Sequence, residues 1–171
     1  HNFKFWPSIS NLTNNKKILI NLYYYNIEYT ITNIIIAKYL VKIYRIECVG
    51  LIRVHDKLNK KILKSFNIKN TIVLNEQNLI DRIKYFVIAF KKLKKINTVD
   101  DLLLLKIENI DFGKIIYDHY VRFECKGTVD FLDEIFVLIL SRALYYFSIS
   151  KDFLNKNKFQ YFIQSEKHWV P

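Results

Sequence analysis

KKILINLYYYNIEYTITNIIIAKYLVKIYRIECVGLIRV, residues 16–54, is the stretch that decides the fold. Residues 16–25 are apolar on both faces of an extended chain, which is typical of a buried parallel strand. From Ile27 to about Tyr44 the apolar residues follow helical spacing, and residues 46–54 form a second apolar run. The stretch therefore predicts a strand, a helix and a second strand.

The same alternation continues further along the chain. Asp56 can cap a helix that runs to about Phe66, residues 70–76 read as a third strand, and a long helix extends from about Asn78 to Ile96. Strands and helices that alternate through short connections favour a parallel sheet with right-handed crossovers. We therefore expect a three-layer, Rossmann-like α/β domain with a mainly parallel sheet. Its predicted core strands are residues 17–25, 46–54, 70–76 and 158–165.

The second half of the chain is predicted to be mostly helical. Thr98 can open a short helix over Val99–Leu105, and Asp111 or Gly113 can start another. Residues 128–130 then cap a long helix that runs to about Asn155. Residues 1–15 are polar and aromatic and are expected to form an N-terminal arm. Residues 16–171 are expected to form a single domain. Because the chain begins at His1 and contains no Met, we expect it to be part of a longer gene product.

Composition excludes several classes of protein. Half of the residues are hydrophobic, which is too many for a disordered chain, yet no uncharged apolar run reaches the ~18 residues of a membrane-spanning helix. The net charge of +11 fits nucleic acid, anionic lipid or phosphate groups. Lys, Asn, Ile, Tyr and Phe are abundant together, however, as in proteins of AT-rich genomes, so no nucleic-acid partner is expected. Cys48 and Cys125 are expected to be reduced thiols in a cytoplasmic protein.

Several functional motifs are missing. The sequence has no GxGxxG after its first strand, no GxxxxGK[ST] and no GxSxG. The two cysteines do not form a CxxC pair and have no nearby set of histidines. We therefore expect no cofactor and no metal site.

Candidate binding residues follow the predicted strands. In open parallel sheets, ligands bind beyond the carboxyl ends of the strands. Polar or titratable side chains follow all four, and the candidates for substrate binding are Asn26, His55, Glu76, Glu166 and His168. The alternative interpretation is structural, since strand ends are usually more polar than strand centres.

A second candidate cluster lies in FGKIIYDHYVRF, residues 112–123. On a helix, Asp118 and Arg122 share one face. In a functional interpretation, Tyr120 or Arg122 faces the cleft and holds a phosphate or a sugar hydroxyl. In a structural interpretation, Asp118 and Arg122 form an exposed ion pair worth at most ~0.5 kcal/mol. His119 is interpreted as an ordinary surface or core histidine.

The same segment resembles a known family. Gly113, Ile116, Tyr117, Asp118, Tyr120 and Arg122, followed by Thr128, Val129 and Asp130, match a G-D-x-I-Y-D-x-Y-x-R and T-[IV]-D pattern. That pattern is similar to the N-terminal half of bacterial capsule or lipopolysaccharide biosynthesis proteins related to GT-B glycosyltransferases. Lys114 stands where the pattern has an acid, and residues 165–168 stand where a Ser-His-Thr turn is expected.

The resemblance implies an acceptor-side, Rossmann-like half of a nucleotide-sugar-dependent glycosyltransferase, inactive alone. The implied partners are a carbohydrate acceptor, a nucleotide sugar, and a missing C-terminal domain or partner subunit. The implied location is the cytoplasm, at the inner face of the membrane. Two alternatives stay open: a non-catalytic α/β interaction module, and a peripheral basic domain that binds anions or membranes. The second predicts one contiguous patch formed by Lys57, Lys60, Lys61, Lys64 and the lysines of residues 91–95.

Overall fold

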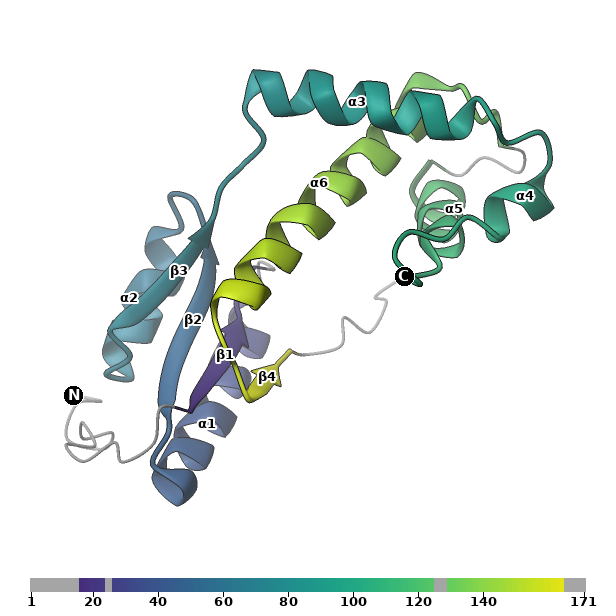
Figure 1. The fold of residues 1–171 in the computed structure, drawn as a ribbon. Helices are drawn as coiled ribbons and strands as arrows, with labels where there is room; N and C mark the ends of the chain where they lie inside the picture. The colour runs from purple at the N-terminus through teal and green to yellow at the C-terminus, as the bar shows by residue number, and fades with distance from the viewer. Residues whose placement is uncertain (1–15, 24–25, 125–128, 165–171) are drawn as a thin grey trace. The chain divides into compact units, whose positions relative to one another are not determined.

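The computed structural model describes residues 16–23, 26–124 and 129–164, which cluster into two compact units (Figure 1). The sheet unit contains the described residues up to Glu76 and from Asp152 onward. The helical unit is Gln77–Lys151. Among the described residues, no helix has the length and hydropathy needed to cross a membrane.

The sheet unit is built on a parallel sheet of four strands: β1 (Lys17–Asn21), β2 (Glu47–Arg53), β3 (Asn70–Leu74) and β4 (Tyr161–Ile163). Their order is β3-β2-β1-β4, and every neighbouring pair is parallel. Ile20 lies opposite Gly50 of β2 on one side and Ile163 of β4 on the other. The prediction of parallel core strands is therefore confirmed.

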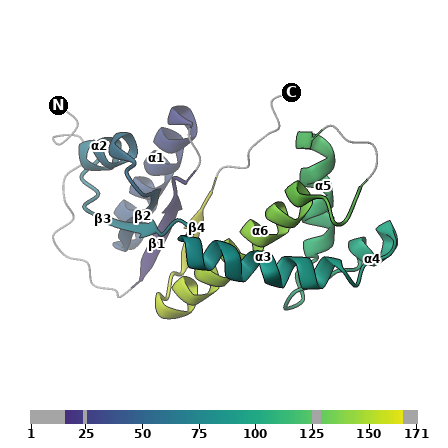
Figure 2. The ribbon, with the colours of Figure 1, turned by 90° about the horizontal axis from the view of Figure 1, so that it is seen from above.

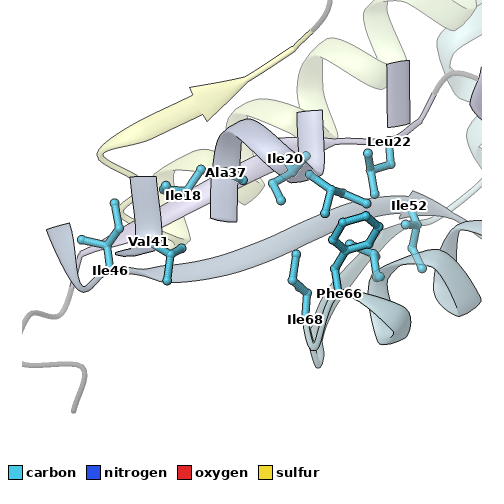
Figure 3. Close-up of a cluster of buried hydrophobic side chains, with 11 residues drawn as sticks. Ile18, Ile20, Leu22, Ala37, Val41, Ile46, Ile52, Phe66 and Ile68 are labelled. Carbon is cyan, nitrogen blue, oxygen red and sulfur yellow. The ribbon is translucent and has the colours of Figure 1, made fainter. Parts of the chain in front are cut away.

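Side chains of β1 enter two different hydrophobic clusters. Ile18 and Ile20 pack in a cluster with residues of α1 (Ile27–Tyr44) and α2 (Lys57–Ser65), which lie on the same side of the sheet (Figures 2 and 3). Leu19, from the opposite face of β1, packs instead in a cluster that includes Phe153 and Phe159. The burial of both faces explains why the strand is apolar on both sides. The predicted three-layer, Rossmann-like α/β class is confirmed.

The two helices of the sheet unit begin at capping residues. The Asn26 side chain accepts a hydrogen bond from the Tyr29 backbone N–H at 3.2 Å, and α1 follows it. The Asp56 side chain accepts from the Asn59 N–H at 2.9 Å, and α2 follows. In each case a side-chain oxygen accepts a hydrogen bond from a backbone N–H that would otherwise lack a partner within the helix. Both helices agree with the predicted ranges.

The helical unit consists of α3 (Leu79–Leu93), α4 (Val99–Leu103), α5 (Phe112–Glu124) and the part of α6 (Glu134–Lys156) up to Lys151. Its core is a separate cluster that includes Leu102, Ile116, Tyr120 and Phe136, all buried. Thr98 starts α4 through a reciprocal capping box with Asp101. Thr98 therefore opens the helix as predicted, and hydrogen bonds from the Asn97 backbone N–H and from Thr98 lower the pKa of Asp101.

Some predicted boundaries are wrong. β1 ends at Asn21 rather than residue 25, since the Asn21 side chain accepts from the Tyr23 backbone N–H at 3.0 Å and turns the chain. β4 is limited to Tyr161–Ile163. The long helix starts at Glu134 rather than directly after residues 128–130, because Asp130 accepts from the Leu132 N–H within a turn. Asp133 is the residue whose carboxylate accepts from the Ile135 N–H at 2.9 Å.

Candidate functional site

The strand order creates a switch point between β1 and β4. The chain leaves β1 through α1 to reach β2 on one side, while β4 pairs with β1 on the other side. In open α/β sheets, ligands bind in the crevice outside the carboxyl ends of strands at such a point. Asn21 ends β1 and donates from its amide nitrogen to the Gln164 side-chain oxygen, just beyond β4, at 3.2 Å. Two carboxamides therefore meet at the switch point.

A pocket of about 410 Å³ lies at the carboxyl end of β2 and the start of α2, in residues 53–58 and 61. The turn at its centre is formed by His55, which has a positive φ of 64°, and by a hydrogen bond from the Asp56 N–H to the Arg53 carbonyl. The cationic side chains at this pocket belong to Arg53, Lys57 and Lys61.

Arg53 links the pocket to the end of β1. Its guanidinium carbon lies 4.8 Å from the centre of the Tyr23 ring, within the range of a cation–π contact. Tyr23 follows β1, so the contact joins the ends of two adjacent parallel strands. A guanidinium that rests on a ring is held in one place, and its planar N–H groups suit a carboxylate or a phosphate.

A buried polar network supports this edge of the sheet. Asn59, 4% exposed, donates from its amide nitrogen to the Leu22 carbonyl at 3.1 Å and to the Asp56 carboxylate at 2.6 Å. Thr30 of α1 donates to the Asn59 side-chain oxygen at 3.3 Å. One side chain therefore joins the end of β1 to the first turns of α1 and α2.

The charge of the pocket favours an anion. Arg53, Lys57 and Lys61 contribute three cations. The single carboxylate at the pocket, that of Asp56, is engaged by both the backbone and the side chain of Asn59. The surplus of positive charge therefore suits a carboxylate or phosphate group on a ligand.

The predicted strand-end residues have different positions. His55 lines the pocket, whereas the side chain of Asn26 caps α1. Glu76 lies beyond the end of β3 and is exposed. Glu166 and His168 lie outside the described residues. Of the strand-end candidates, His55 is thus the one placed in the described pocket.

The residues of the second candidate cluster belong to α5 of the helical unit. Tyr120 is fully buried, and its hydroxyl donates to the Asp133 carboxylate at 2.8 Å, next to the start of α6. Arg122 Nε lies 2.6 Å from Asp118 Oδ1, and both side chains are about half exposed. The predicted helix and its Asp–Arg pair are confirmed. The described contacts of Tyr120 and of the ion pair are those of packing and surface charge within this unit.

The structure adds Asn21 and Asn59, which were not among the sequence-based candidates. Lys57 and Lys61 belong to the predicted basic patch, and Arg53 lies at the end of the second strand, so their positions in the sequence indicate the same edge. Asn21 lies inside the predicted first strand, and Asn59 lies inside a helix, where no sequence pattern marks a buried amide. Their importance depends on contacts between segments far apart in the chain.

The described residues contain no group of three His, Cys, Asp or Glu side chains that could hold a metal ion. Cys48 is a free thiol, as predicted, and Cys125 lies outside the described residues. Burial raises the pKa of Cys48 to about 12, with a smaller opposing effect of Lys38. A thiol with that pKa is protonated at neutral pH and is a poor nucleophile.

Comparisons of the chain with protein-family models, with curated proteins and with solved structures found no match.

Proposed function

We propose that this chain is the acceptor-side domain of a glycosyltransferase-like protein of bacterial surface-polysaccharide biosynthesis. In this proposal, a saccharide that carries a carboxylate or phosphate binds at the carboxyl edge of the sheet. The observation that carries the proposal is the cationic pocket that contains Arg53, at the carboxyl end of β2, the strand that pairs with β1. Residues 112–123 and 128–130 support the family assignment through their sequence alone.

In this proposal, the residues of the motif at 112–123 serve packing, and other residues bind the ligand. Gly113 and Tyr120 hold the helical unit together, while the groups that suit a ligand lie on the sheet unit. Arg53 orients the anionic group, and the carboxamides of Asn21 and Gln164 bind sugar hydroxyls. Neutral amides and a fixed guanidinium provide recognition rather than bond cleavage, which fits an acceptor-binding role.

Chemical-shift mapping by NMR tests the binding site. Glucose 1-phosphate is the anionic probe, and maltose is the uncharged control. We expect glucose 1-phosphate to shift the amide signals of Tyr23 and of residues 53–61, with binding that weakens as salt increases. Maltose should shift them less. Equal effects of the two sugars, or shifts confined to α5, would contradict the proposed site.

Calorimetric titration with UDP-, GDP- and CMP-sugars tests the implied half-enzyme. Transfer from such donors needs cations, helix N-termini or a metal at the leaving diphosphate. We expect weak or no binding and no turnover by these residues alone, with activity only when a second domain is supplied. Micromolar donor binding together with turnover would show that the half-enzyme interpretation is wrong.

Peripheral membrane association is a second candidate, favoured by one face of α3. Its exposed residues Ile80, Ile83 and Val87 follow each other at helical spacing, and Lys84 and Lys91 lie beside them. Apolar residues bordered by lysines are typical of helices that lie on an anionic bilayer. Cosedimentation with phosphatidylglycerol vesicles that is lost in Ile83→Glu would support this function. The same small bound fraction for both proteins would reject it.

A further inference from the structure

Helix α1 is apolar on both of its faces. Ile34, Ala37 and Val41 are buried in the core cluster shared with the sheet. The outward face carries Ile35, 43% exposed, and Tyr39, 63% exposed, and two further exposed isoleucines, Ile36 and Ile43, border them. A helix that is hydrophobic all round is normally covered on every side. A cluster of large apolar side chains on one helix face indicates an interaction surface.

The charges on this face are arranged symmetrically. Glu28 lies about two helical turns before Ile35, and Lys42 lies about two turns after it, so the three residues fall nearly in line along the helix. Both charged side chains belong to exposed residues. Neither forms an ion pair with another residue in the part of the chain that the structure describes. Ile35 is therefore the midpoint of an apolar stripe with opposite charges at its two ends.

We propose that α1 mediates a symmetric homodimer in which two copies of this helix pack antiparallel, with Ile35 at the two-fold axis. A two-fold operation about Ile35 brings Glu28 of one copy opposite Lys42 of the other, and the reverse. Tyr39 of each copy packs beside the axis. The surface is therefore complementary to itself, because apolar side chains meet at its centre and opposite charges meet at its two ends.

Charge distinguishes this surface from the apolar stripe on α3. Lys84 and Lys91 border the α3 stripe, so an antiparallel pair of α3 helices would place lysines beside lysines. α3 also has an acidic residue in its first turn, Asp81, but it follows Ile80 directly and therefore lies about 100° from it around the helix, off the stripe. On α1, Glu28 and Lys42 lie at the two ends of the stripe itself, so antiparallel pairing joins opposite charges. A second copy thus fits α1 in a way that it does not fit α3.

Analytical ultracentrifugation of the whole chain tests the dimer. Two packed helices bury less area than a standard protein interface. We therefore expect monomer and dimer to be in equilibrium at chain concentrations between about 10 and about 300 µM. Ile35→Lys should make the chain monomeric over this range without changing its circular dichroism. The control is Leu104→Lys, at an exposed residue in the helical unit, which should leave the equilibrium unchanged.

A charge exchange tests the antiparallel register. Glu28→Lys and Lys42→Glu should each weaken the dimer at least ~10-fold, because each places like charges opposite one another. A mixture of the two single variants should form a heterodimer, and the double variant should again form a homodimer. A monomer at all concentrations, or a dimer insensitive to Ile35→Lys, would overturn the proposal. Vesicle binding that depends on Ile35 would also overturn it and assign the face to a lipid surface.

Discussion

Gly113 lies where α5 meets the end of α4. Its N–H donates to the Leu105 carbonyl at 3.0 Å, and a Cβ at this position would overlap the carbonyl oxygen of Leu102. Because both contacts involve backbone, the chain cannot relax by moving a side chain. The glycine of the sequence motif is therefore explained by close packing of two helices.

Gly113→Ala is expected to destabilise the protein by about 3 kcal/mol or more, measured by urea unfolding. The matched control is Gly50→Ala in β2. A Cβ there would lie 2.6 Å from a Leu63 methyl carbon, which is the end of a flexible side chain. We expect a smaller loss of about 1–2 kcal/mol for Gly50→Ala. Equal losses for the two variants would contradict the close contact at Gly113.

Burial of Cys48 should make the free energy of unfolding depend on pH. Its pKa is raised by burial to about 12, whereas an unfolded thiol titrates near about 8.5. A raised pKa means that the folded state favours the neutral thiol. This contribution to stability is complete below the unfolded pKa and is lost as the pH rises toward the folded pKa. The free energy of unfolding should therefore fall through this alkaline window.

Alkylation by iodoacetamide at pH 8.5, followed by mass spectrometry of the peptide that contains Cys48, measures the same shift. The folded chain should react at least ~100-fold more slowly at Cys48 than the chain unfolded in urea, because the thiolate is the reactive form. Similar rates in the two states would show that the thiol is not buried as described.

At the scale of elements, the start of α6 depends on Asp133. Its carboxylate accepts from the Ile135 N–H and from the Tyr120 hydroxyl, so it joins α5 to the first turn of α6. Asp133→Ala removes a helix cap and leaves a buried hydroxyl without this partner. We expect a loss of about 2 kcal/mol, measured by thermal unfolding.

Asp130→Ala is the control, because the sequence pattern places the cap at residues 128–130. Asp130 accepts from the Leu132 N–H in an exposed turn, so its removal should cost less than ~1 kcal/mol. A larger loss for Asp130→Ala than for Asp133→Ala would place the helix start where the sequence alone predicted it.

These elements show what the sequence could predict. The ranges of α1 and α2 were predictable because an apolar period and a capping residue coincide at Asn26 and Asp56. The start of α6 was not, because Asp130 and Asp133 are chemically identical caps and a tertiary contact with Tyr120 accompanies the second. The pocket edge was predictable from strand ends, but the Asn59 network was not, because it joins three separate segments.

At the scale of the whole molecule, the chain divides its two sequence patterns between two units. The alternating strands and helices form the sheet unit, and the motif at residues 112–123 lies in the helical unit. The cationic pocket and the polar network around Asn59 belong to the sheet unit alone. We therefore propose that Arg53 binds the ligand and that the motif helix serves packing within the helical unit.

Calorimetric titration of glucose 1-phosphate into Arg53→Ala and Arg122→Ala tests this assignment most directly. Both variants remove one exposed arginine and change the net charge equally, so nonspecific attraction falls by the same amount in each. We expect Arg53→Ala to weaken binding at least ~10-fold and Arg122→Ala to bind like the unaltered chain. Loss of binding in Arg122→Ala, with binding unchanged in Arg53→Ala, would contradict this assignment and place the site on α5.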